Sequence, residues 1–399
     1  MNTLGFSETF STEGRVELRN EFFEDFGTNQ RTCGSCHKVT EGWTINALNT
    51  RILFELTRGL DPLFRTNDGT NSPNADVSTV SARRKAYSML LNRGTIRVGI
   101  GMPATAEFEL VAVDDPYNYA SAAELSMFRR PLPAANLTAI PTVMWDGRVT
   151  GATINDALKE QANGATQGHA ARPTPLNDET RQAIVDFETG LFNAQAYTFG
   201  LGYLDRDGAG GRAEILASQN VEFTTTIPTR DERRWSLFDS WADSPDPDRR
   251  AVYRGQELFN TRPHVNDANG NPRPEFTCTN CHTVQNFGTD LAGRFFNILD
   301  PAALPVRRAP DQPLYTFRNT TTNATVQITD PGRALITGLW RDMGRFKVPS
   351  IRGLAARAPY FHDGSANTLL DVVKKYEQFQ NFNFTDAEER DLVAFLSAL

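Results

Sequence analysis

The chain holds four cysteines, and all of them fall in two copies of the pattern Cys-x-x-Cys-His. The first copy comprises Cys33, Cys36 and His37, and the second comprises Cys278, Cys281 and His282. Two thiols three residues apart can add to the two vinyl groups of one haem, and the adjacent imidazole then reaches the iron as its proximal ligand. The spacing therefore predicts two covalently attached haems c.

Two other uses of these cysteines explain the pattern less well. A Cys-x-x-Cys redox pair needs neither a second copy nor a following histidine. A zinc site built from all four thiolates would leave His37 and His282 without a role. The haem interpretation accounts for all six residues, with His37 as a ligand of the first iron and His282 as a ligand of the second.

Length and charge agree with two haem domains in an exported protein. A chain of 399 residues is long enough for two or three domains with separate cores. The net charge of -7 and the lack of a long apolar run predict no general attraction to nucleic acid and no membrane span. Haem c is normally attached outside the cytoplasm, so we expect a periplasmic location. The first ten residues lack a basic start and an apolar segment, so we expect a processed or engineered form without its export signal.

Each Cys-x-x-Cys-His copy is followed by the same series of short patterns. Proline with Ser or Thr and an aliphatic residue comes first, then Asp-Gly after Trp or His, then an amphipathic helix. The repetition indicates an internal duplication with one haem domain per copy. We therefore predict a mainly α fold with two cytochrome c-like haem domains, long loops and few short strands. The patterns occupy residues 141–143, 145–148 and 153–161 in the first half and residues 349–351, 362–365 and 368–376 in the second.

Composition suggests the domain boundaries. We predict an N-terminal haem domain over residues 1–204 and a C-terminal haem domain over residues 251–399. The intervening residues 205–250 are rich in Asp, Arg, Gly and Pro, which favours an interdomain connection or insertion, with a β-like stretch at residues 221–227. Apolar periodicity predicts further helices at residues 16–26, 178–192, 249–259 and 386–399.

Three further blocks carry a family resemblance. They are MWDGR at residues 144–148, the long segment at residues 344–373 and the C-terminal residues 384–399. With these blocks and the two Cys-x-x-Cys-His copies, the sequence resembles the bacterial di-haem cytochrome c peroxidases and their MauG-type relatives. The resemblance implies that the N-terminal haem reacts with peroxide. It also implies that the C-terminal haem receives electrons from a small redox protein and passes them across to the N-terminal haem.

The resemblance also implies which residues face the first haem. It places a distal glutamine on the helix after Trp-Asp-Gly-Arg, and Gln161 fits this role. An acidic acid/base residue is implied about three turns further on, where this sequence has no Glu or Asp. His169 is nearest to that position, and three roles are open for it. It transfers the proton instead, it binds the iron and blocks it, or it is a surface histidine in a Gly-rich loop.

For the second haem, the duplication aligns Gln161 with Tyr376. The resemblance implies a distal ligand fourteen residues after the histidine of Phe-His-Asp-Gly, which is Met in typical peroxidases and Tyr in MauG-type enzymes. This position is again Tyr376. A phenolate ligand would stabilise ferric iron and lower its potential. In the alternative, Tyr376 is a packed aromatic residue, and Met343 or a water fills the site.

The resemblance assigns Trp145 to electron transfer between the haems, whereas a lone Trp is more often core packing. Arg148 bonds either a haem propionate or Asp146. His362 precedes the second distal helix, so it contacts either a propionate or the iron. His264 has no matching role and is expected to be exposed.

Relatives in the resembled family also hold a calcium ion between their domains, partly through backbone carbonyls. Here those carbonyls would be the ones of Arg357 and Pro359. The expected Asn side chain is not evident near Arg129 and Arg130, so calcium stays an open possibility. Paired arginines such as residues 129–130 are interpreted mostly as solvated surface.

Three functions follow from these patterns. The first is a periplasmic peroxidase that reduces hydrogen peroxide with electrons from a small cytochrome c or a cupredoxin. The second is a MauG-like enzyme, favoured by Tyr376, that oxidises Trp or Tyr residues of a partner protein through a high-valent di-haem state. The third is a non-catalytic di-haem electron carrier with both irons capped, for example by His169. The chain is either a monomer or a homodimer.

Overall fold

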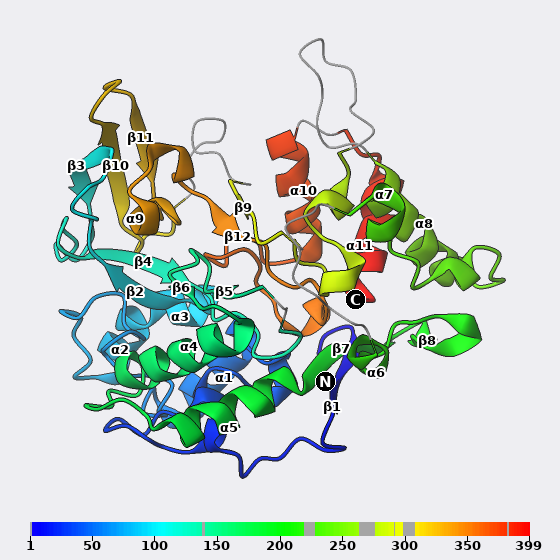
Figure 1. Cartoon of the computed structure of the whole chain (residues 1–399), viewed down its shortest axis with the longest axis horizontal. Helices are drawn as coiled ribbons and strands as arrows, with labels where there is room; N and C mark the ends of the chain where they lie inside the picture. The colour runs from blue at the N-terminus through cyan, green and yellow to red at the C-terminus, as the bar shows by residue number, and fades with distance from the viewer. Residues whose placement is uncertain are drawn as a thin grey trace.

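The computed structural model describes residues 2–137, 140–218, 228–262, 276–290, 292–297, 308–380 and 383–399. Helices and small sheets are mixed along the whole chain (Figure 1). The prediction of a mainly α chain is therefore met only in part, because short strands are more numerous than expected.

The helices and strands have the following bounds. The helices are α1 Ala47–Thr57, α2 Val80–Ala86, α3 Ser88–Arg93, α4 Ile154–Gly168, α5 Asp178–Thr189, α6 Ala213–Ala217, α7 Arg230–Arg233, α8 Pro247–Thr261, α9 Ala334–Thr337, α10 Leu369–Gln380 and α11 Asp386–Ser397. The strands are β1 Gly5–Ser11, β2 Ile96–Ile100, β3 Phe108–Asp114, β4 Leu125–Arg129, β5 Thr142–Val143, β6 Val149–Thr150, β7 Leu191–Thr198, β8 Gly202–Tyr203, β9 Phe295–Phe296, β10 Leu314–Asn319, β11 Thr325–Ile328 and β12 Phe346–Lys347.

Most of the predicted helices are confirmed. The two helices of the repeated pattern are α4 and α10. The periodic segment at residues 249–259 lies within α8, and the segment at residues 386–399 forms α11 as far as Ser397. The helix predicted at residues 178–192 ends at Thr189, and the chain then continues as strand β7. Capping boxes, in which a Thr and an acidic residue three positions later each bind the other's backbone amide, begin α4 and α11.

The predicted helix at residues 16–26 is wrong. Only a single 3-10 turn forms there, Glu21–Phe23, with the side chain of Asn20 accepting a hydrogen bond from the amide of Phe22. Phe22 and Phe23 are aromatic neighbours of each other, and Phe22 also contacts the ring of Trp43. Tertiary packing of these rings outweighs the weak helical propensity of the segment.

Strands from both halves of the chain share one sheet. Its order is β11-β10-β3, so strands from near the C-terminus pair with a strand from the first half. In Figure 1 the gold β10 and β11 accordingly lie beside the cyan β3. The two predicted haem domains interlock at this sheet, and the boundaries at residues 204 and 250 stay a prediction.

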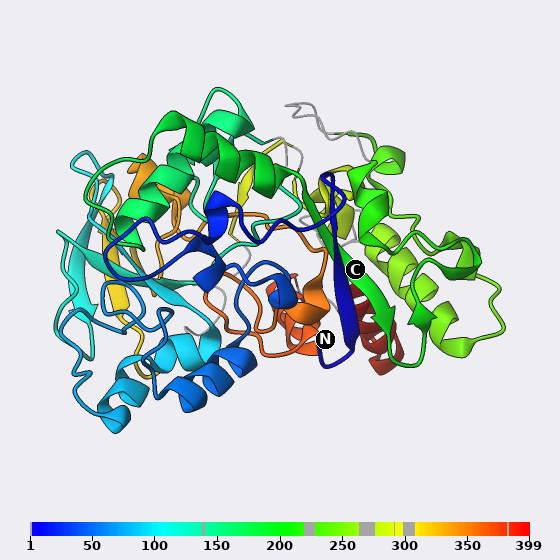
Figure 2. The same ribbon diagram turned by 90° about the horizontal axis from the view of Figure 1, so that it is seen from below.

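A second sheet joins the N-terminus to the middle of the chain. Strand β1 pairs antiparallel with β7 from Gly5 to Ser11, and β8 extends the sheet. Figure 2 shows β1 and β7 running together between the N-terminal elements on one side and α8 on the other. The C-terminus contacts this sheet: the amide of Gln195 in β7 donates a hydrogen bond to the carbonyl of Leu399.

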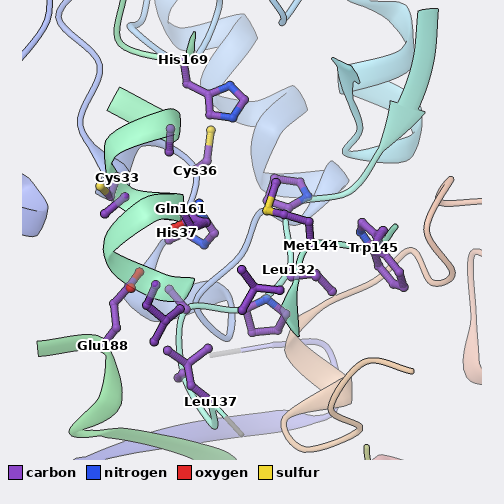
Figure 3. A pocket seen from close by; sticks show the side chains of 18 of the residues that line it. Cys33, Cys36, His37, Leu132, Leu137, Met144, Trp145, Gln161, His169 and Glu188 are labelled. Carbon is purple, nitrogen blue, oxygen red and sulfur yellow. The ribbon is translucent and has the colours of Figure 1, made fainter. Parts of the chain in front are cut away.

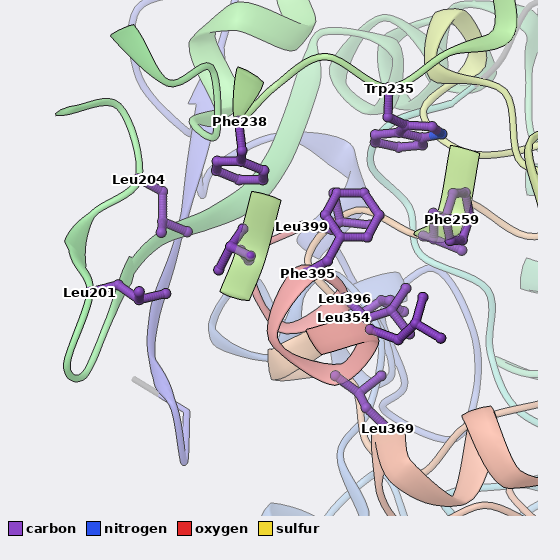
Figure 4. Packing of buried hydrophobic residues seen from close by; sticks show 14 of the residues in the cluster. Leu201, Leu204, Trp235, Phe238, Phe259, Leu354, Leu369, Phe395, Leu396 and Leu399 are labelled. Carbon is purple, nitrogen blue, oxygen red and sulfur yellow. The ribbon is translucent and has the colours of Figure 1, made fainter. Parts of the chain in front are cut away.

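The largest buried cluster lies in the second half, around α8 and α11 (Figure 4). Its fully buried aromatic residues include Trp235, Phe238 and Trp241, which precede α8. These residues belong to the stretch predicted as an interdomain connection, so its C-terminal part is core of the second half. The β-like stretch at residues 221–227 lies outside the described residues. None of the described helices is long and apolar enough to span a membrane.

The contact between α8 and α11 depends on one glycine. A Cβ added at Gly255 would lie 1.9 Å from the carbonyl oxygen of Asp391, a backbone atom that cannot move aside cheaply. We expect Gly255→Ala to destabilise the protein by about 1–3 kcal/mol, because overpacking forces the two helices apart. Thermal unfolding followed by circular dichroism measures the effect.

Gly164 on α4 supplies the matched control, because a Cβ there would meet nothing within 4 Å. Gly164→Ala should stabilise the protein by about 0.5–1 kcal/mol, the difference in helix propensity. Equal melting temperatures for the two variants would show that α8 and α11 do not pack as described.

Candidate functional site

A cavity that opens to solvent surrounds the first Cys-x-x-Cys-His segment, named here the first haem motif. Side chains of the motif and of distant segments line it together (Figure 3). The structure thus gathers every residue that the sequence assigned to the first haem. These residues are Cys33, Cys36, His37, Trp145, Arg148, Gln161 and His169.

The first haem motif has a fixed local geometry. A 3-10 turn, Cys33–Ser35, starts after Thr32, whose backbone amide donates a hydrogen bond to the Oγ of Ser35. The amide of His37 donates to the carbonyl of Cys33, and its ring Nδ1 lies 3.0 Å from the carbonyl oxygen of Trp43. Donation from Nδ1 to that carbonyl leaves the Nε2 lone pair free for a metal, which is the usual arrangement of a metal-binding histidine.

The second Cys-x-x-Cys-His segment, the second haem motif, repeats this geometry. Its 3-10 turn is Cys278–Asn280, with Asn280 capping the amide of Thr277. The ring Nδ1 of His282 lies 2.6 Å from the carbonyl oxygen of Gly288, which follows His282 by the same six residues that separate His37 from Trp43. The shared geometry supports the predicted duplication at the level of the two motifs.

Burial sets the protonation of the motif side chains. It raises the pKa of Cys36 to about 11 and those of Cys278 and Cys281 to about 12. It lowers the pKa of His37 to about 4 and also lowers the pKa of His282. Reactive redox cysteines instead have lowered pKa values. Free thiols beside neutral imidazoles are the form in which these motifs accept a haem.

The first cavity also holds a cation suited to a haem propionate. Lys347 lines the cavity, and its Nζ donates to the carbonyl of Thr142 at 2.6 Å. Burial lowers the pKa of Lys347 to about 8, and no carboxylate pairs with it within the described residues. A propionate would supply the missing negative charge. The donor set of the cavity therefore fits a haem.

The second haem motif has a comparable unpaired cation. Arg352 is buried, and its Nε and Nη1 have no hydrogen-bond partner in the described part of the chain. Its guanidinium lies 6.0 Å from the ring of Trp235, whose Nε1 donates to the carbonyl of His282. Burial lowers the pKa of Arg352 to about 9. A buried guanidinium with two orphaned donors fits a carboxylate such as a propionate of the second haem.

Two of the predicted distal residues lie on or beside α4. Figure 3 shows Gln161 projecting from α4 close to His37, and His169 beyond Cys36. His169 caps the C-terminal end of α4, and its side chain is 38% exposed. Its Nδ1 is hydrogen-bonded to the carboxylate of Asp68. A plain surface histidine would not be expected to have this buried partner.

Glu188 is a cavity residue that the sequence analysis missed. It lies near the end of α5, is 7% exposed, and lines the cavity at the end opposite to His169 (Figure 3). Its Oε2 has no partner among the described residues, and burial raises its pKa to about 8. The signal was present in the sequence, because Glu188 shares a helical face with the apolar Ile184 and Val185.

Trp145 lies where the two halves meet. Its Nε1 donates to the carbonyl of Arg130 at 2.8 Å, and its own carbonyl accepts from the amide of Lys347 at 2.8 Å. Its ring meets that of His362 edge to face at 6.2 Å, and His362 stacks on Phe346 at 3.9 Å. Trp145 and His362 are equivalent positions of the repeated pattern, so the two copies touch there.

A buried ion-pair network fixes the residue next to Trp145. Asp146 is fully buried, and its carboxylate pairs with Arg129 and, at 3.0 Å, with Arg148. Burial alone would raise the pKa of Asp146, but the two guanidinium groups outweigh it and the pKa is lowered. Arg129 also forms two bonds, of 2.7 and 2.8 Å, to the carboxylate of Asp330 in the second half. Arg148 therefore has the contact with Asp146 that was one of its two predicted roles.

The two candidate ligands of the second haem lie in different surroundings. Tyr376 is half-buried on α10, and the thiols of Cys281 and Cys278 add to burial in raising its pKa, which requires that they lie close by. Met343 is packed in an apolar cluster with residues of the shared sheet such as Phe317. This arrangement favours Tyr376, whose ligand role stays a prediction.

The predicted calcium position does not fit a calcium ion. The carbonyl of Arg357 accepts a 2.8 Å bond from the guanidinium of Arg130, which also donates to the carbonyls of Ile45 and Arg93. Burial, followed by the charge of Arg357, lowers the pKa of Arg130 to about 9. A second cation beside this guanidinium would be repelled. The interpretation of residues 129–130 as solvated surface is wrong, because both side chains are buried. His264 lies outside the described residues.

The chain is similar in sequence to known cytochrome c peroxidases and to MauG. No protein-family model matches the chain. It is 42% identical over 69 residues to the cytochrome c551 peroxidase of Nitrosomonas europaea, covering 17% of this chain and 21% of that protein. It is 26% identical over 292 residues to the methylamine utilization protein MauG of Methylophilus methylotrophus, covering 70% of each. It is 30% identical over 192 residues to the cytochrome c peroxidase Ccp of Escherichia coli, covering 48% of this chain and 33% of that protein.

One solved structure, a MauG-like protein associated with microbial copper homeostasis, matches 87% of each chain with 17% identity and a TM-score of 0.37. Together with the two haem motifs, the sequence relatives make the chain similar to the cytochrome c peroxidases and the MauG proteins.

The guanidinium of Arg130 should make the protein independent of calcium. We expect a calcium chelator to leave its melting temperature and its electron paramagnetic resonance spectrum unchanged, because the guanidinium of Arg130 already donates to the carbonyl of Arg357 and places a positive charge at the predicted site. Arg130→Gln should destabilise it by about 1–3 kcal/mol, because buried carbonyls lose their donors. A lower melting temperature after chelation of the wild-type protein would contradict this assignment.

Glu188 should make stability fall as the pH rises. Its pKa is raised from 4.5 to about 8, so the folded state retains a proton that the unfolded chain releases. The stability that this proton supplies is present below about pH 4.5 and is lost as the pH rises through 8. We expect Glu188→Gln to raise the free energy of unfolding at pH 8 by about 1–3 kcal/mol, with little effect at pH 4.5. Denaturant titration at both pH values measures it.

The exposed Glu160 on α4 is the control for this measurement. Glu160→Gln should change the free energy of unfolding by less than about 0.5 kcal/mol at either pH. Equal effects of the Glu188 and Glu160 variants at pH 8 would contradict the burial of an unpartnered carboxyl.

Proposed function

We propose that the protein is a periplasmic di-haem c-type peroxidase. It reduces hydrogen peroxide at the N-terminal haem with electrons that a small cytochrome c or cupredoxin delivers through the C-terminal haem. The proposal rests on one observation above all. A single cavity brings the first haem motif together with Gln161 and His169, a hydrogen-bonding amide and a proton-transfer group. An electron carrier with a closed haem needs neither.

Each residue of the cavity is assigned a separate role in peroxide reduction. The haem, when bound, supplies an iron that accepts peroxide and exchanges electrons. His37 would hold it, because its Nδ1 is tied to the carbonyl of Trp43 and its Nε2 is left as a metal ligand. The amide of Gln161 orients the peroxide, and the imidazole of His169 moves a proton between the two peroxide oxygens. Lys347 and Arg148 lie at the cavity wall, where they would bind the haem propionates or the residues beside the propionates.

Trp145 is proposed to carry electrons between the two halves. Its ring forms part of the wall of the first cavity and contacts the ring of His362 from the second half. His362 in turn stacks on Phe346. A row of aromatic rings shortens each electron step, and the buried ion pair of Asp146 with Arg129 holds the first ring in place.

Tyr376 favours a second candidate function, oxidation of Trp or Tyr residues of a partner protein. A tyrosinate ligand on the second haem would lower its potential and stabilise its oxidised states. Such a haem is poorly suited to receive electrons from a small donor. In the third candidate, a di-haem electron carrier, the free Nε2 of His169 would have to bind the first iron.

Three measurements on the exported protein distinguish these functions. Mass spectrometry should find two haem masses added to the polypeptide. Electron paramagnetic resonance of the ferric protein should show one high-spin, open iron, and steady-state assays should show turnover with hydrogen peroxide and reduced cytochrome c. Slow turnover together with a long-lived oxidised state after stoichiometric peroxide would favour partner oxidation. Two low-spin irons and no turnover would leave only the electron carrier.

Substitution of Tyr376 tests the ligand of the second haem. We expect Tyr376→Phe to change the electronic and paramagnetic spectra of that haem and to raise its potential, because the phenolate donor is lost. Met343→Leu is the matched control, and it should leave both spectra unchanged because Met343 is packed in an apolar cluster. The reverse result, with only the Met343 variant altered, would transfer the ligand role to Met343.

A further inference from the structure

The imidazole of His169 ends a chain of buried charged groups. Its Nδ1 is hydrogen-bonded to Oδ2 of Asp68, and Oδ1 of Asp68 pairs with Nη1 of Arg31. Asp68 and Arg31 are only 6% and 2% exposed, whereas the ring of His169 reaches the cavity. Neither Asp68 nor Arg31 has a role in the function proposed above.

Backbone groups hold this chain in one geometry. The Nε of Arg31 donates to the carbonyl of Pro62 at 2.9 Å, and its Nη2 donates to the carbonyl of Leu63 at 2.7 Å. The carbonyl of Asp68 accepts a 2.7 Å bond from the amide of Arg97. Arg31 therefore cannot turn away from Asp68 without losing two further bonds, and Asp68 is fixed at its backbone as well as at its carboxylate.

The backbone of His169 is fixed independently of its ring. Its carbonyl accepts a bond of 2.8 Å from the side chain of Asn29 and one of 3.2 Å from the side chain of Asn67. Its amide continues the hydrogen bonds of α4 to the carbonyl of Ala165. With the backbone and Nδ1 both held, Nε2 is the ring atom left for the cavity.

We infer that Asp68 is a positioning residue, which fixes His169 with its proton on Nδ1 and its Nε2 lone pair toward peroxide at the first haem. Arg31 in turn fixes Asp68. This inference rests on the proposed function, because it assigns Asp68 to the same proton transfer. The acidic residue expected at this position is absent from the chain. An imidazole takes its place, and a buried carboxylate sets the tautomer of that imidazole.

The proton transfer balances as follows. Nε2 of His169 takes the proton from one peroxide oxygen and gives it to the other. The O–O bond breaks, its electron pair stays with the oxygen that has received the proton, and that oxygen leaves as water. The other oxygen becomes a second water with two electrons from the small redox protein and two protons from solvent. With the wrong tautomer Nε2 carries a proton already and cannot accept one.

A double-mutant cycle on the holoprotein tests whether Asp68 acts through His169. We expect Asp68→Asn to lower the second-order rate constant with hydrogen peroxide about 100-fold, within the usual range for general acid–base catalysis. His169→Ala should lower it at least as much, and Asp68→Asn should have no further effect in the His169→Ala protein. Asp68→Glu, which keeps a carboxylate, should restore part of the rate. Asp76→Asn, an exposed loop residue, is the control.

A spectroscopic readout separates positioning from a merely structural role. Cyanide bound to the first haem would meet the same imidazole, so its C–N stretching frequency should shift in Asp68→Asn and His169→Ala alike, and not in Asp76→Asn. Asp68→Asn leaves the buried charge of Arg31 without its partner, which destabilises the folded protein. The double variant Arg31→Gln with Asp68→Asn removes both charges and should show the same rate and the same shift.

The outcomes distinguish this inference from the proposed function. If the wild type reacts with peroxide while the Asp68 variants retain its rate and cyanide frequency, the positioning role is wrong. If the effects of Asp68→Asn and His169→Ala simply multiply, Asp68 does not act through His169, and the inference is likewise wrong. If the wild type does not react at all, the proposed function fails, and a cyanide frequency insensitive to Asp68 would overturn the positioning role as well.

Discussion

The geometry between the two halves depends on one buried guanidinium. Arg129 at the end of β4 binds Asp146 of the first half and Asp330 of the second, and all three side chains are shielded from water. Removing one partner of such a network leaves a buried charge uncompensated, at a cost of about 3–5 kcal/mol. Because Asp146 directly follows Trp145, the same network fixes the aromatic ring through which the halves touch.

Each haem motif combines a rigid local turn with a cation brought from far along the chain. The turn is determined locally, by a capping side chain and by the bond from the histidine Nδ1 to a carbonyl six residues later. Lys347 at the first motif and Arg352 at the second are neighbours in sequence, but they lie at different motifs. One short segment of the second half therefore lies at both motifs, as strand β10 of the second half pairs with β3 of the first.

The acid–base groups of the first cavity come from separate segments and differ in kind. His169 is hydrogen-bonded to Asp68, which pairs with Arg31, whereas Glu188 is a buried carboxyl whose Oε2 has no partner in the part of the chain that the structure describes. The first arrangement sets the direction of an imidazole. The second keeps a carboxyl protonated at neutral pH and costs stability, as unpaired buried polar groups commonly do at functional sites.

The sequence by itself determined the two haem motifs and the helices with strong periodicity, because these signals lie within a few turns of one another. The roles of Gln161 and Tyr376 stay predictions that rest on a family resemblance. Local propensity misjudged residues 16–26, where ring packing around Phe22 decides the backbone. Only the tertiary structure placed Arg130 on the carbonyl of Arg357, Asp68 on His169 and Glu188 in the cavity. These partners are separated by as many as 227 residues, and which of them meet depends on long-range packing that leaves no periodic signal in the chain.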